Sequence, residues 1–332
     1  MRIALDAMGG DHAPGAVVEG SLKAAEEWPD AELYLLGHEP LVRPLIGSQP
    51  PTNLHLQVVE EWIEADEEPV RAIRRKKGSS IVVGCRMVKE GEMDAFISAG
   101  NTGALMAAGT MVTGRLSAID RPALSPVFPT LDGKGMLVLD VGANPDARPE
   151  HLKQYALMGS LYAEKVMGQE KPRVGLLNIG TEEGKGNALT KEAYEEIRRL
   201  PVHFVGNVEA RDILHGVCDV LVSDGFTGNV LLKNTEGIAK GVFGRLKEEL
   251  TRNPLTKLAA AILKPGLKRF AQDLDYKEHG GAPLLGLKGP VVKAHGSSDG
   301  RAVFNAIGQA RRFVERGVIP GISEELQRLE RG

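Results

Sequence analysis

The sequence has little of what marks a disulfide-rich, membrane-spanning or nucleic-acid-binding protein. Its 332 residues include only two cysteines, Cys85 and Cys218, and both lie in apolar stretches, which predicts buried thiols rather than a disulfide or a nucleophile. No apolar run reaches the roughly 18 residues that a membrane-spanning helix needs. The formal net charge of -3 argues against nucleic acid as a partner.

Targeting and linker signals are also scarce. The amino-terminal stretch MRIALDAMGG lacks the long apolar region and the cleavage site of a signal peptide, so a reducing, cytoplasmic location is expected. No Ser/Pro/Gly-rich linker or low-complexity tract divides the chain, which predicts one domain or two closely associated ones. We interpret residues 1–332 as a single α/β/α domain with an amphipathic helical excursion at about 235–275.

Short Val/Ile/Leu-rich runs alternate along the chain with longer amphipathic segments. This alternation is typical of βα units around a mainly parallel sheet covered on both faces, so we expect an α/β fold, a three-layer α/β/α sandwich. The expected strands are 2–6, 32–36, 54–58, 94–98, 136–140, 173–178, 202–205, 219–223 and 291–294.

Glycine-containing polar loops follow six of these strands. They read DAMGGDHAPG, SAGNTGA, DVGANPD, NIGTEEGKGN, SDGFTGN and AHGSSDG. The carboxyl ends of the strands in an open α/β sheet face one crevice, where helix amino termini offer unpaired N–H groups, so the loops together predict an anion site. Any single loop can be an ordinary turn. The recurrence of polar residues beside the glycines favours binding.

The loops match neither of two common nucleotide-binding patterns. GTEEGKGN, residues 180–187, is one residue short of a Walker loop and has no hydroxyl residue after its lysine. DAMGGDHAPG has adjacent glycines where the dinucleotide fingerprint needs G-x-G-x-x-G. A P-loop nucleotidase and an ordinary Rossmann cofactor are therefore disfavoured, and we expect no cofactor.

Metal ligands show no recognisable spacing, because the eight histidines are scattered without an H-x-x-x-H pair. Four aspartates at strand ends, Asp6, Asp11, Asp140 and Asp224, can gather around Mg²⁺, but aspartates in such places more often cap helices. We predict no metal site, with magnesium as the alternative.

Lys185 stands out as a cation between two glycines at a strand exit. One interpretation is a surface ion pair with Glu182 or Glu183. The other is an ammonium that holds phosphate or stabilises a developing oxyanion. The sequence offers no obvious Ser-His-Asp triad, which suggests chemistry without a covalent enzyme intermediate.

Longer motifs recur in a distinctive order over nearly the whole chain: MRIALDAMGGDHAPG, FISAGNTGALMAAG, LDVGAN, NIGTEEGKGN, LVSDGFTGNVLLKNTEG and AHGSSDGRAVFNAI. With these motifs the sequence resembles the bacterial phosphate acyltransferase (PlsX) family of glycerolipid synthesis. The resemblance implies transfer of a long acyl chain from acyl carrier protein to inorganic phosphate, which gives acyl phosphate. It also implies a homodimer and a fold similar to isocitrate and isopropylmalate dehydrogenases and to phosphotransacetylases.

The residues and this reaction fit each other, because phosphate is a competent nucleophile once it is desolvated and aimed at the thioester carbonyl. The predicted catalytic residues are Lys185, Asp224, Asn229 and His295. Lys185 and Asn229 would hold phosphate or the oxyanion, Asp224 would orient Lys185 or a phosphate proton, and His295 would protonate the departing thiolate. The predicted phosphate- and substrate-binding residues are Asp6, Gly9, Gly10, Asp11, Asn101, Thr102, Gly103, Asn144, Asn187, Gly225, Thr227, Gly228 and Ser297.

The stretch EEPVRAIRRKKGSS concentrates positive charge and bears on partners. Its cations are Arg71, Arg74, Arg75, Lys76 and Lys77. Such a cluster suits a strongly acidic acyl carrier protein, although a charge run is usually a solvated helix face.

The stretch NPLTKLAAAILKPGLKRFAQDL, residues 253–274, combines an apolar helical stripe with a rim of basic residues. The stripe contains Leu255, Leu258, Ala259, Ile262 and Leu263, and the rim contains Lys257, Lys264, Lys268 and Arg269. We expect the helix to break at Pro265. The stripe predicts either a core or dimer contact, or a short hairpin lying in a membrane interface. Because a membrane-bound glycerol-phosphate acyltransferase would use the amphiphilic product, we expect peripheral association with the inner face of the cell membrane.

Three rival functions remain at this point. A short-chain phosphate acyltransferase that uses coenzyme A would need neither the basic cluster nor the apolar hairpin. A decarboxylating hydroxyacid dehydrogenase would require a nicotinamide cofactor and a metal. A catalytically idle scaffold would bind carrier protein at the membrane without turnover.

Overall fold

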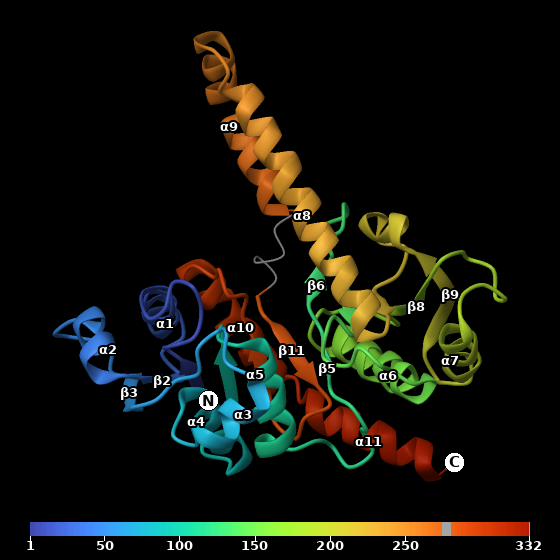
Figure 1. The fold of residues 1–332 in the computed structure, drawn as a ribbon, viewed down its shortest axis with the longest axis horizontal. Helices are drawn as coiled ribbons and strands as arrows, with labels where there is room; N and C mark the ends of the chain where they lie inside the picture. Colours follow the sequence, from blue (N-terminus) through green and yellow to red (C-terminus); the bar gives the residue numbers. More distant parts are fainter. Residues whose placement is uncertain (274–279, 332) are drawn as a thin grey trace.

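The computed structural model describes residues 1–273 and 280–331, and their strands form two sheets (Figure 1). The seven-stranded sheet has the order β3-β2-β1-β4-β12-β11-β5, and the five-stranded sheet has the order β6-β7-β10-β8-β9. The first sheet contains β1 (Arg2–Asp6), β2 (Glu32–Gly37), β3 (Leu54–Val58), β4 (Ala95–Ser98), β5 (Ala123–Leu124), β11 (Ala282–Leu285) and β12 (Val291–Lys293). The second contains β6 (Val127–Phe128), β7 (Met136–Leu139), β8 (Arg173–Asn178), β9 (His203–Glu209) and β10 (Val220–Val222).

Every strand expected from the sequence has a counterpart, and most bounds agree within a residue or two. The strand expected at 202–205 is longer, because β9 continues to Glu209. Three strands were not expected: β5, β6 and β11. All three pair antiparallel with a neighbour, whereas the expected strands pair parallel with one another. β5 and β6 have only two residues each, too few for a hydrophobic pattern.

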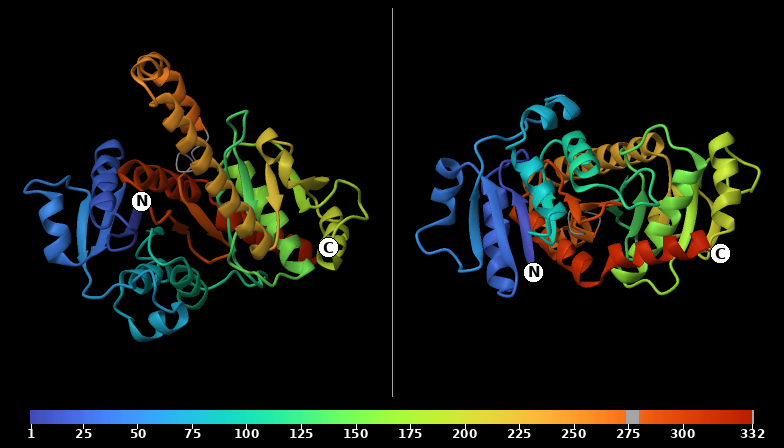
Figure 2. Two further views of the ribbon diagram at one scale, coloured as in Figure 1. Left: turned by 45° about the horizontal axis from the view of Figure 1, so that its top comes forward. Right: turned by 90° about the horizontal axis from the view of Figure 1, so that it is seen from below.

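These short strands connect the two sheets. β5 pairs with β11 in the first sheet, β6 pairs with β7 in the second, and only Ser125 and Pro126 separate β5 from β6. Figure 2 shows the strands of the two sheets on opposite sides of the body. One hydrophobic cluster includes Phe96 of the first sheet and Val138 of the second, so the sheets share a core.

Helices cover the faces of both sheets, as the sequence predicted. They are α1 (Gly15–Glu27), α2 (Glu39–Ile46), α3 (Pro69–Arg75), α4 (Ser80–Lys89), α5 (Thr102–Ala108), α6 (Pro149–Lys165), α7 (Ala188–Arg198), α8 (Gly225–Leu250), α9 (Pro254–Asp273), α10 (Gly300–Glu315) and α11 (Val318–Arg331). α1 and α10 pack together on one face of the seven-stranded sheet, while α4 and α5 bury side chains against its other face. α6 packs on the five-stranded sheet beside α7 and α11. The predicted α/β architecture is therefore confirmed.

α8 and α9 form a hairpin that projects from the body (Figure 1). α8 begins inside the body, directly after β10, and its outer half leaves the body beside α9. The expected break at Pro265 was wrong, because α9 continues through this proline to Asp273. Leu274 and the side chains of Lys268 and Arg269 lie outside the described residues.

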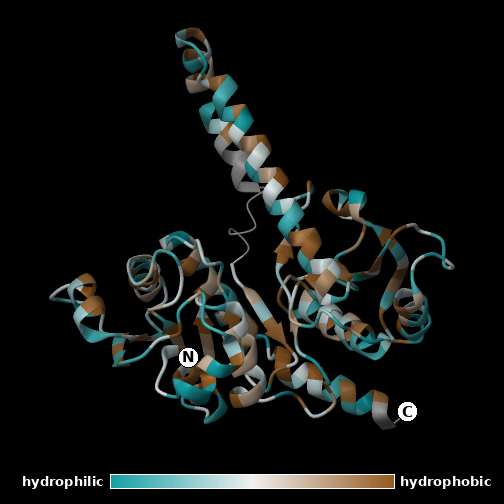
Figure 3. Cartoon of the chain, in the orientation of Figure 1, coloured by the Kyte–Doolittle hydropathy of each residue, from teal (hydrophilic) through white to brown (hydrophobic). Residues whose placement is uncertain are grey.

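The hairpin exposes aliphatic and aromatic side chains, which give it brown bands in Figure 3. Those of α9 are Leu255, Leu258, Ile262, Leu263 and Phe270. Exposed fractions of 80% for Leu255 and 75% for Ile262 exclude a core position within this chain. Within residues 1–273 and 280–331, no helix has both the length and the apolar character needed to cross a bilayer.

Candidate active site

The loops after β1, β4 and β12 meet at the carboxyl edge of the seven-stranded sheet. The Ser98 hydroxyl donates to Asp6 Oδ2 at 2.6 Å, and the Gly100 N–H donates to Ser98 Oγ at 3.0 Å. The Asp11 N–H donates to the Gly296 carbonyl at 2.8 Å. Three loops that lie far apart in the sequence are thus fixed to one another.

Glycine allows these loops to approach so closely. A Cβ added at Gly9 would lie 2.4 Å from Asp6 Oδ2 and 2.6 Å from the Gly100 nitrogen. Gly10 has a φ of 107°, a conformation that L side chains rarely adopt. The glycines that the sequence pattern indicated therefore place backbone, rather than side chains, at the site.

A cavity of about 300 Å³ lies between the two sheets. One part of its lining is aliphatic and comprises Leu124, Pro126, Val127, Val141, Leu232 and Ala282. The polar part comprises Thr102, Asn229, Lys233, Glu236, Lys293 and His295. α8 supplies four of these residues, so the long helix connects the cavity to the projecting hairpin. We call this space the aliphatic cavity.

A second cavity of about 260 Å³ lies beside the first and is lined largely by residues that follow β1 and β4. Its lining includes Gly9, Gly10, Asp11, Glu64, Gly100 and Asn101. Thr102, Lys293 and Gly296 line both spaces, so the cavities adjoin at these residues. We call the second space the glycine-lined cavity.

Lys293 is a buried cation at the junction. It ends β12, opposite Ser98 of β4, and only 8% of the residue is exposed. Its ammonium donates to the carbonyls of Ala99, at 3.1 Å, and Ala294. Burial lowers the pKa of Lys293 to about 8, although the charges of Asp6 and Asp11 oppose the shift.

Glu236 connects α8 to the loop after β12. Its Oε2 accepts from Lys233 Nζ at 2.9 Å, and its Oε1 lies 3.6 Å from His295 Nε2. The second distance exceeds a hydrogen bond, so the contact with His295 is an electrostatic attraction. His295 and Lys233 nevertheless hold the pKa of Glu236 at about 2. Within the described part of the chain, Oε1 is buried and accepts no hydrogen bond.

The imidazole of His295 is oriented by its own loop. The Ser297 N–H donates to Nδ1 at 3.1 Å, and Ser297 Oγ lies 2.9 Å from the same nitrogen. Because Nδ1 accepts, the ring proton of the neutral imidazole belongs on Nε2, which faces Glu236. This geometry gives Ser297 a positioning contact with His295.

The predicted residues divide into those that line a cavity and those that hold the loops. Asn229, His295 and Thr102 line the aliphatic cavity. Gly9, Gly10, Asp11, Asn101 and Thr102 line the glycine-lined cavity.

Three predicted polar residues cap helices. Asn101 Oδ1 accepts from the Ala104 N–H at 2.9 Å, and Asn187 Oδ1 accepts from the Thr190 N–H at 2.9 Å. Asp224 accepts from both the N–H and the hydroxyl of Thr227, at 2.8 and 2.7 Å. These contacts occupy the side chains with their own helix starts, as Asn and Asp prefer.

Three predicted glycines permit close packing. A Cβ on Gly228 would lie 1.9 Å from the Asp140 carbonyl oxygen, and a Cβ on Gly225 would lie 2.7 Å from the backbone carbonyl oxygen of Asn144. A Cβ on Gly103 would lie 2.5 Å from Pro69 Cγ, where α5 meets α3. These glycines position α8 and α3 at the site.

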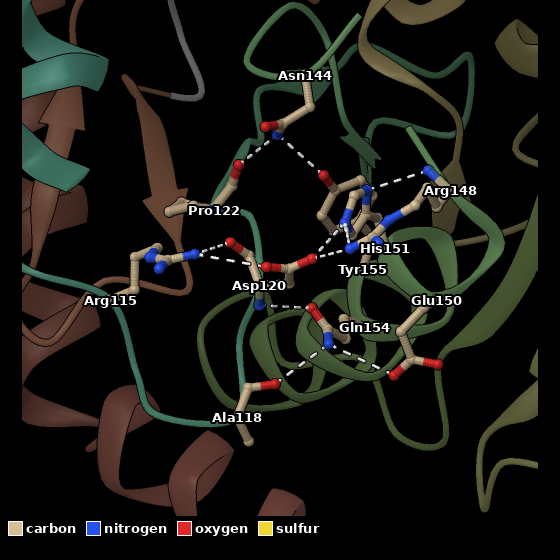
Figure 4. Close-up of polar contacts among 10 residues, drawn as sticks. All are labelled: Arg115, Ala118, Asp120, Pro122, Asn144, Arg148, Glu150, His151, Gln154 and Tyr155. Carbon is tan, nitrogen blue, oxygen red and sulfur yellow. Dashed lines mark hydrogen bonds and ion pairs between the residues drawn. The ribbon is translucent and has the colours of Figure 1, made fainter. Parts of the chain in front are cut away.

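A polar network fixes the loop after β7 (Figure 4). The Asn144 side chain donates to the Pro122 carbonyl at 2.6 Å and to the Tyr155 hydroxyl at 2.9 Å. Beside it, His151 Nε2 lies 2.9 Å from Asp120 Oδ2. Asp140 is buried and accepts N–H bonds from Leu124, Gly142, Ala143 and Asn144. Asn144 therefore supports the wall of the aliphatic cavity without lining it.

Lys185 lies outside the lining of both cavities. Its side chain is half-exposed, and Nζ is 3.9 Å from Glu182 Oε1, which is the surface pair considered from the sequence. Its catalytic role stays a prediction. The loop that carries Lys185 follows β8, which lies beside β10 in the five-stranded sheet, and β10 leads into the helix that carries Asn229.

The four aspartates considered for magnesium do not form one group. Asp6 belongs to β1 of the seven-stranded sheet, whereas Asp140 follows β7 of the other sheet. Over residues 1–273 and 280–331, no cluster of three or more His, Cys, Asp or Glu residues is arranged to hold a metal ion. Cys85 and Cys218 are buried free thiols, and burial raises the pKa of each to about 12.

Sequence reasoning missed three polar residues of the site: Lys293, Lys233 and Glu236. Lys293 carried a usable signal, since it is a lone lysine at the end of the apolar run PVVK, directly before a polar glycine loop. Lys233 and Glu236 carried none. They lie on a helix whose remaining charges face solvent, and only the placement of α8 selects them.

The arginines of the basic cluster lie on α3, and its lysines directly follow that helix. The segment before α3 lines the glycine-lined cavity. Arg71, Arg74, Arg75 and Lys77 are exposed. Lys76 differs, because its ammonium donates to Glu67 at 2.5 Å and to the Trp62 carbonyl at 2.9 Å. The Asn101 side chain donates to the carbonyls of Glu64, Ala65 and Glu67, which ties the segment before α3 to the start of α5.

Comparison with known proteins extends over nearly the whole chain. The family model described as "Fatty acid synthesis protein" matches residues 1–320. A "Phosphate acyltransferase" of Bacillus cereus (strain ATCC 14579) is 57% identical over 329 residues, 99% of each chain. Another, of Geobacillus sp. (strain WCH70), is 58% identical over 328 residues, 98% of this chain and 99% of the relative.

Solved structures with this fold are more distant in sequence. A phosphotransacetylase from Streptococcus pyogenes aligns with a TM-score of 0.60 at 18% identity, over 94% of both chains. The EutD phosphotransacetylase from Staphylococcus aureus gives a TM-score of 0.59 at 18% identity, also over 94% of both chains. At this identity the likeness establishes the α/β fold alone.

Proposed function

The chain belongs to the phosphate acyltransferase family, described as fatty acid synthesis proteins, and is an acyltransferase; on this premise we propose its donor, acceptor and product. The donor is a long-chain fatty acyl group on acyl carrier protein, and the acceptor is inorganic phosphate. The product is acyl phosphate, which supplies phospholipid synthesis.

The aliphatic cavity is the observation that carries this proposal. Aliphatic side chains on one side suit a fatty acyl chain, while Asn229, Lys293 and His295 on the other suit a thioester carbonyl and an anion. A short acetyl group would not need an aliphatic wall continuous with α8. This residue distribution favours a long acyl chain over the short-chain alternative.

The reaction needs alignment and charge stabilisation more than a strong base. A phosphate oxygen attacks the thioester carbonyl carbon, a C–O bond forms, and collapse of the tetrahedral intermediate breaks the C–S bond. The proton of hydrogen phosphate is transferred overall to the departing thiolate, which completes the balance. We propose that Asn229 donates to the oxyanion and that His295 carries the proton.

Lys185 keeps its predicted role in this scheme, whereas Asp224, predicted to orient Lys185 or a phosphate proton, is given a different one. Lys185 would approach phosphate or the oxyanion from the loop after β8, by leaving its long contact with Glu182. Asp224 would fix the start of α8, and therefore Asn229, through its two bonds from Thr227.

We propose that acyl carrier protein docks on the exposed cations of α3. Arg71, Arg74 and Arg75 lie on this helix, and the segment before it contributes Glu64 to the glycine-lined cavity. A carrier held there by charge would bring its prosthetic arm close to the site. Lys76 contributes less, because Glu67 already pairs with it.

We propose that the hairpin of α8 and α9 associates peripherally with the inner face of the cell membrane. The apolar side chains of α9 are exposed, and Lys257 and Lys264 flank them, which suits an anionic lipid surface. A membrane-bound glycerol-phosphate acyltransferase would receive the amphiphilic product there. We also propose a homodimer, for which the exposed apolar side chains of α8 offer a surface.

The test is turnover of palmitoyl-acyl carrier protein by the purified protein, with and without phosphate. Free thiol and hydroxylamine-trapped acyl phosphate are measured together. Phosphate-dependent release of both supports the proposal, and no release with intact carrier binding supports the scaffold alternative. Higher kcat/KM with acetyl-coenzyme A would favour the short-chain alternative, and a nicotinamide absorbance change with a hydroxyacid would favour the dehydrogenase.

A further inference from the structure

The buried ammonium of Lys293 has no ion-pair partner among the described residues. It donates to two backbone carbonyls, and Asp6 and Asp11 act on it only as more distant charges. Removing an ammonium from water costs several kcal/mol unless an opposite charge compensates it. A lysine that ends an apolar strand, with only neutral acceptors in contact, therefore indicates an anionic ligand.

The position of Lys293 specifies where this anion would bind. Lys293, Thr102 and Gly296 are the residues that line both cavities. An ammonium carries three N–H donors, and the described carbonyls accept two of them. The remaining donor can serve a ligand at the junction, where a nucleophile in one cavity would meet an electrophile in the other.

The two linings differ in the ligands they suit. The aliphatic cavity accommodates a hydrocarbon chain, whereas the glycine-lined cavity presents backbone around Gly9, Gly10 and Gly100. Asp11 and Glu64 also line the second cavity, and their negative charge opposes an anion. Both are exposed, so water and salt screen them more than they screen the buried ammonium.

We propose that Lys293 binds inorganic phosphate in the glycine-lined cavity, at the junction with the aliphatic cavity, where the acyl thioester lies. This inference rests on the proposed function and assigns its phosphate-binding cation. The ammonium holds a non-attacking phosphate oxygen, so a second phosphate oxygen points toward the thioester carbonyl. Asp6 is a positioning residue, because its bonds with Ser98 and the Met8 N–H fix the loops around the ammonium.

The test replaces Lys293 with two neutral residues. Lys293→Met removes the charge, and Lys293→Gln removes the charge but keeps a donor for the nearby carbonyls. Lys288→Met is the matched control, since Lys288 is an exposed lysine on the same β11–β12 connection and lies outside both cavities. Phosphate and palmitoyl-acyl carrier protein are each varied at saturation of the other. Thermal unfolding is followed with and without phosphate.

Both Lys293 variants are expected to raise the KM for phosphate about 30-fold, as loss of a charged hydrogen bond would. The KM for palmitoyl-acyl carrier protein should stay within about threefold of wild type, because Lys293 does not hold the carrier. Protection against unfolding by phosphate should disappear. Without phosphate, the Tm of at least Lys293→Gln should lie within about 3 °C of wild type. Lys288→Met should behave as wild type.

Protection by coenzyme A distinguishes binding of inorganic phosphate from binding of a phosphate group that belongs to the acyl donor. If the variants lose protection by coenzyme A but keep protection by inorganic phosphate, Lys293 binds the phosphodiester of the acyl donor, and the proposal is overturned. An unchanged phosphate KM in both variants of an active enzyme overturns it as well. A wild-type protein that makes no acyl phosphate refutes the proposed function instead, so the two failures are distinguishable.

Discussion

His295 Nε2 and Glu236 Oε1 lie 3.6 Å apart and connect the loop after β12 to the long helix α8. Glu236 contacts two cationic or ionisable groups, because its other oxygen pairs with Lys233 at 2.9 Å. The arrangement orients the imidazole from its Nε2 side, while Ser297 orients it from the Nδ1 side. With contacts at both ring nitrogens, the imidazole of His295 is preorganised for the proton transfer proposed for it.

Glu236→Gln should therefore weaken both stability and catalysis. The contacts with His295 and Lys233 lower the pKa of Glu236 to about 2, from an ordinary value of 4.5. A lowered carboxyl pKa stabilises the fold above pH 4.5, and this contribution is lost as pH falls toward 2. We expect the variant to lose roughly 1–2 kcal/mol of unfolding free energy at pH 7, with a shrinking deficit below pH 4.5.

Urea unfolding at pH 7, 4 and 3 checks this expectation. Glu39→Gln is the matched control, because Glu39 forms an exposed ion pair with Arg43 and should change stability by less than about 0.5 kcal/mol. A pH-independent deficit for Glu236→Gln would contradict the assignment. In the same variant, kcat should fall about tenfold with little change in the KM for phosphate.

The sequence predicted the parallel strands well, because each is a buried apolar run bounded by polar glycine loops. It could not predict how these strands divide between two sheets. That division depends on β5, β6 and β11, and β5 and β6 are too short to show periodicity. Pro283 within β11 is also a residue that strands generally disfavour.

The site was predicted in part for a similar reason. Glycine loops are recognisable in the sequence, so Gly9, Gly10, Thr102 and His295 were predicted from such loops, and all four line a cavity. Glu236 lies three turns into a helix that extends beyond the body, and nothing local distinguishes it from exposed charges nearby. Asn187 and Asp224 share the polar signature of binding residues, yet their observed contacts are helix caps.

Lys185→Met tests the cation that the sequence pattern singled out. If Lys185 approaches phosphate or the oxyanion, the variant should raise the KM for phosphate or lower kcat at least tenfold, since a charged contact is lost. Stability should barely change, because the pair with Glu182 is exposed and 3.9 Å long. Lys191→Met, an exposed lysine on α7, is the control. Wild-type kinetics in Lys185→Met would remove this residue from the mechanism.

Charge reversal on α3 tests the carrier docking site. Arg74→Glu combined with Arg75→Glu should raise the KM for palmitoyl-acyl carrier protein about tenfold or more and leave the KM for phosphate unchanged, because both side chains are exposed and outside the cavities. The wild-type KM for the carrier should rise with salt, and this dependence should weaken in the variant. Arg198→Glu with Arg199→Glu, at the C-terminal end of α7, controls for net charge. Equal effects from the two pairs would exclude a specific docking surface.

Leu258→Glu tests the membrane surface on the hairpin. Leu258 is 65% exposed, so a carboxylate there should not unfold the protein, but it places charge within the apolar stripe of α9. We expect sedimentation with phosphatidylglycerol vesicles to fall at least fivefold, since insertion would bury the new charge. Leu41→Glu, on the exposed surface of α2, should sediment as wild type. If Leu258→Glu kept full vesicle binding but changed the oligomeric mass in solution, the stripe would be a protein contact, and the membrane proposal would fail.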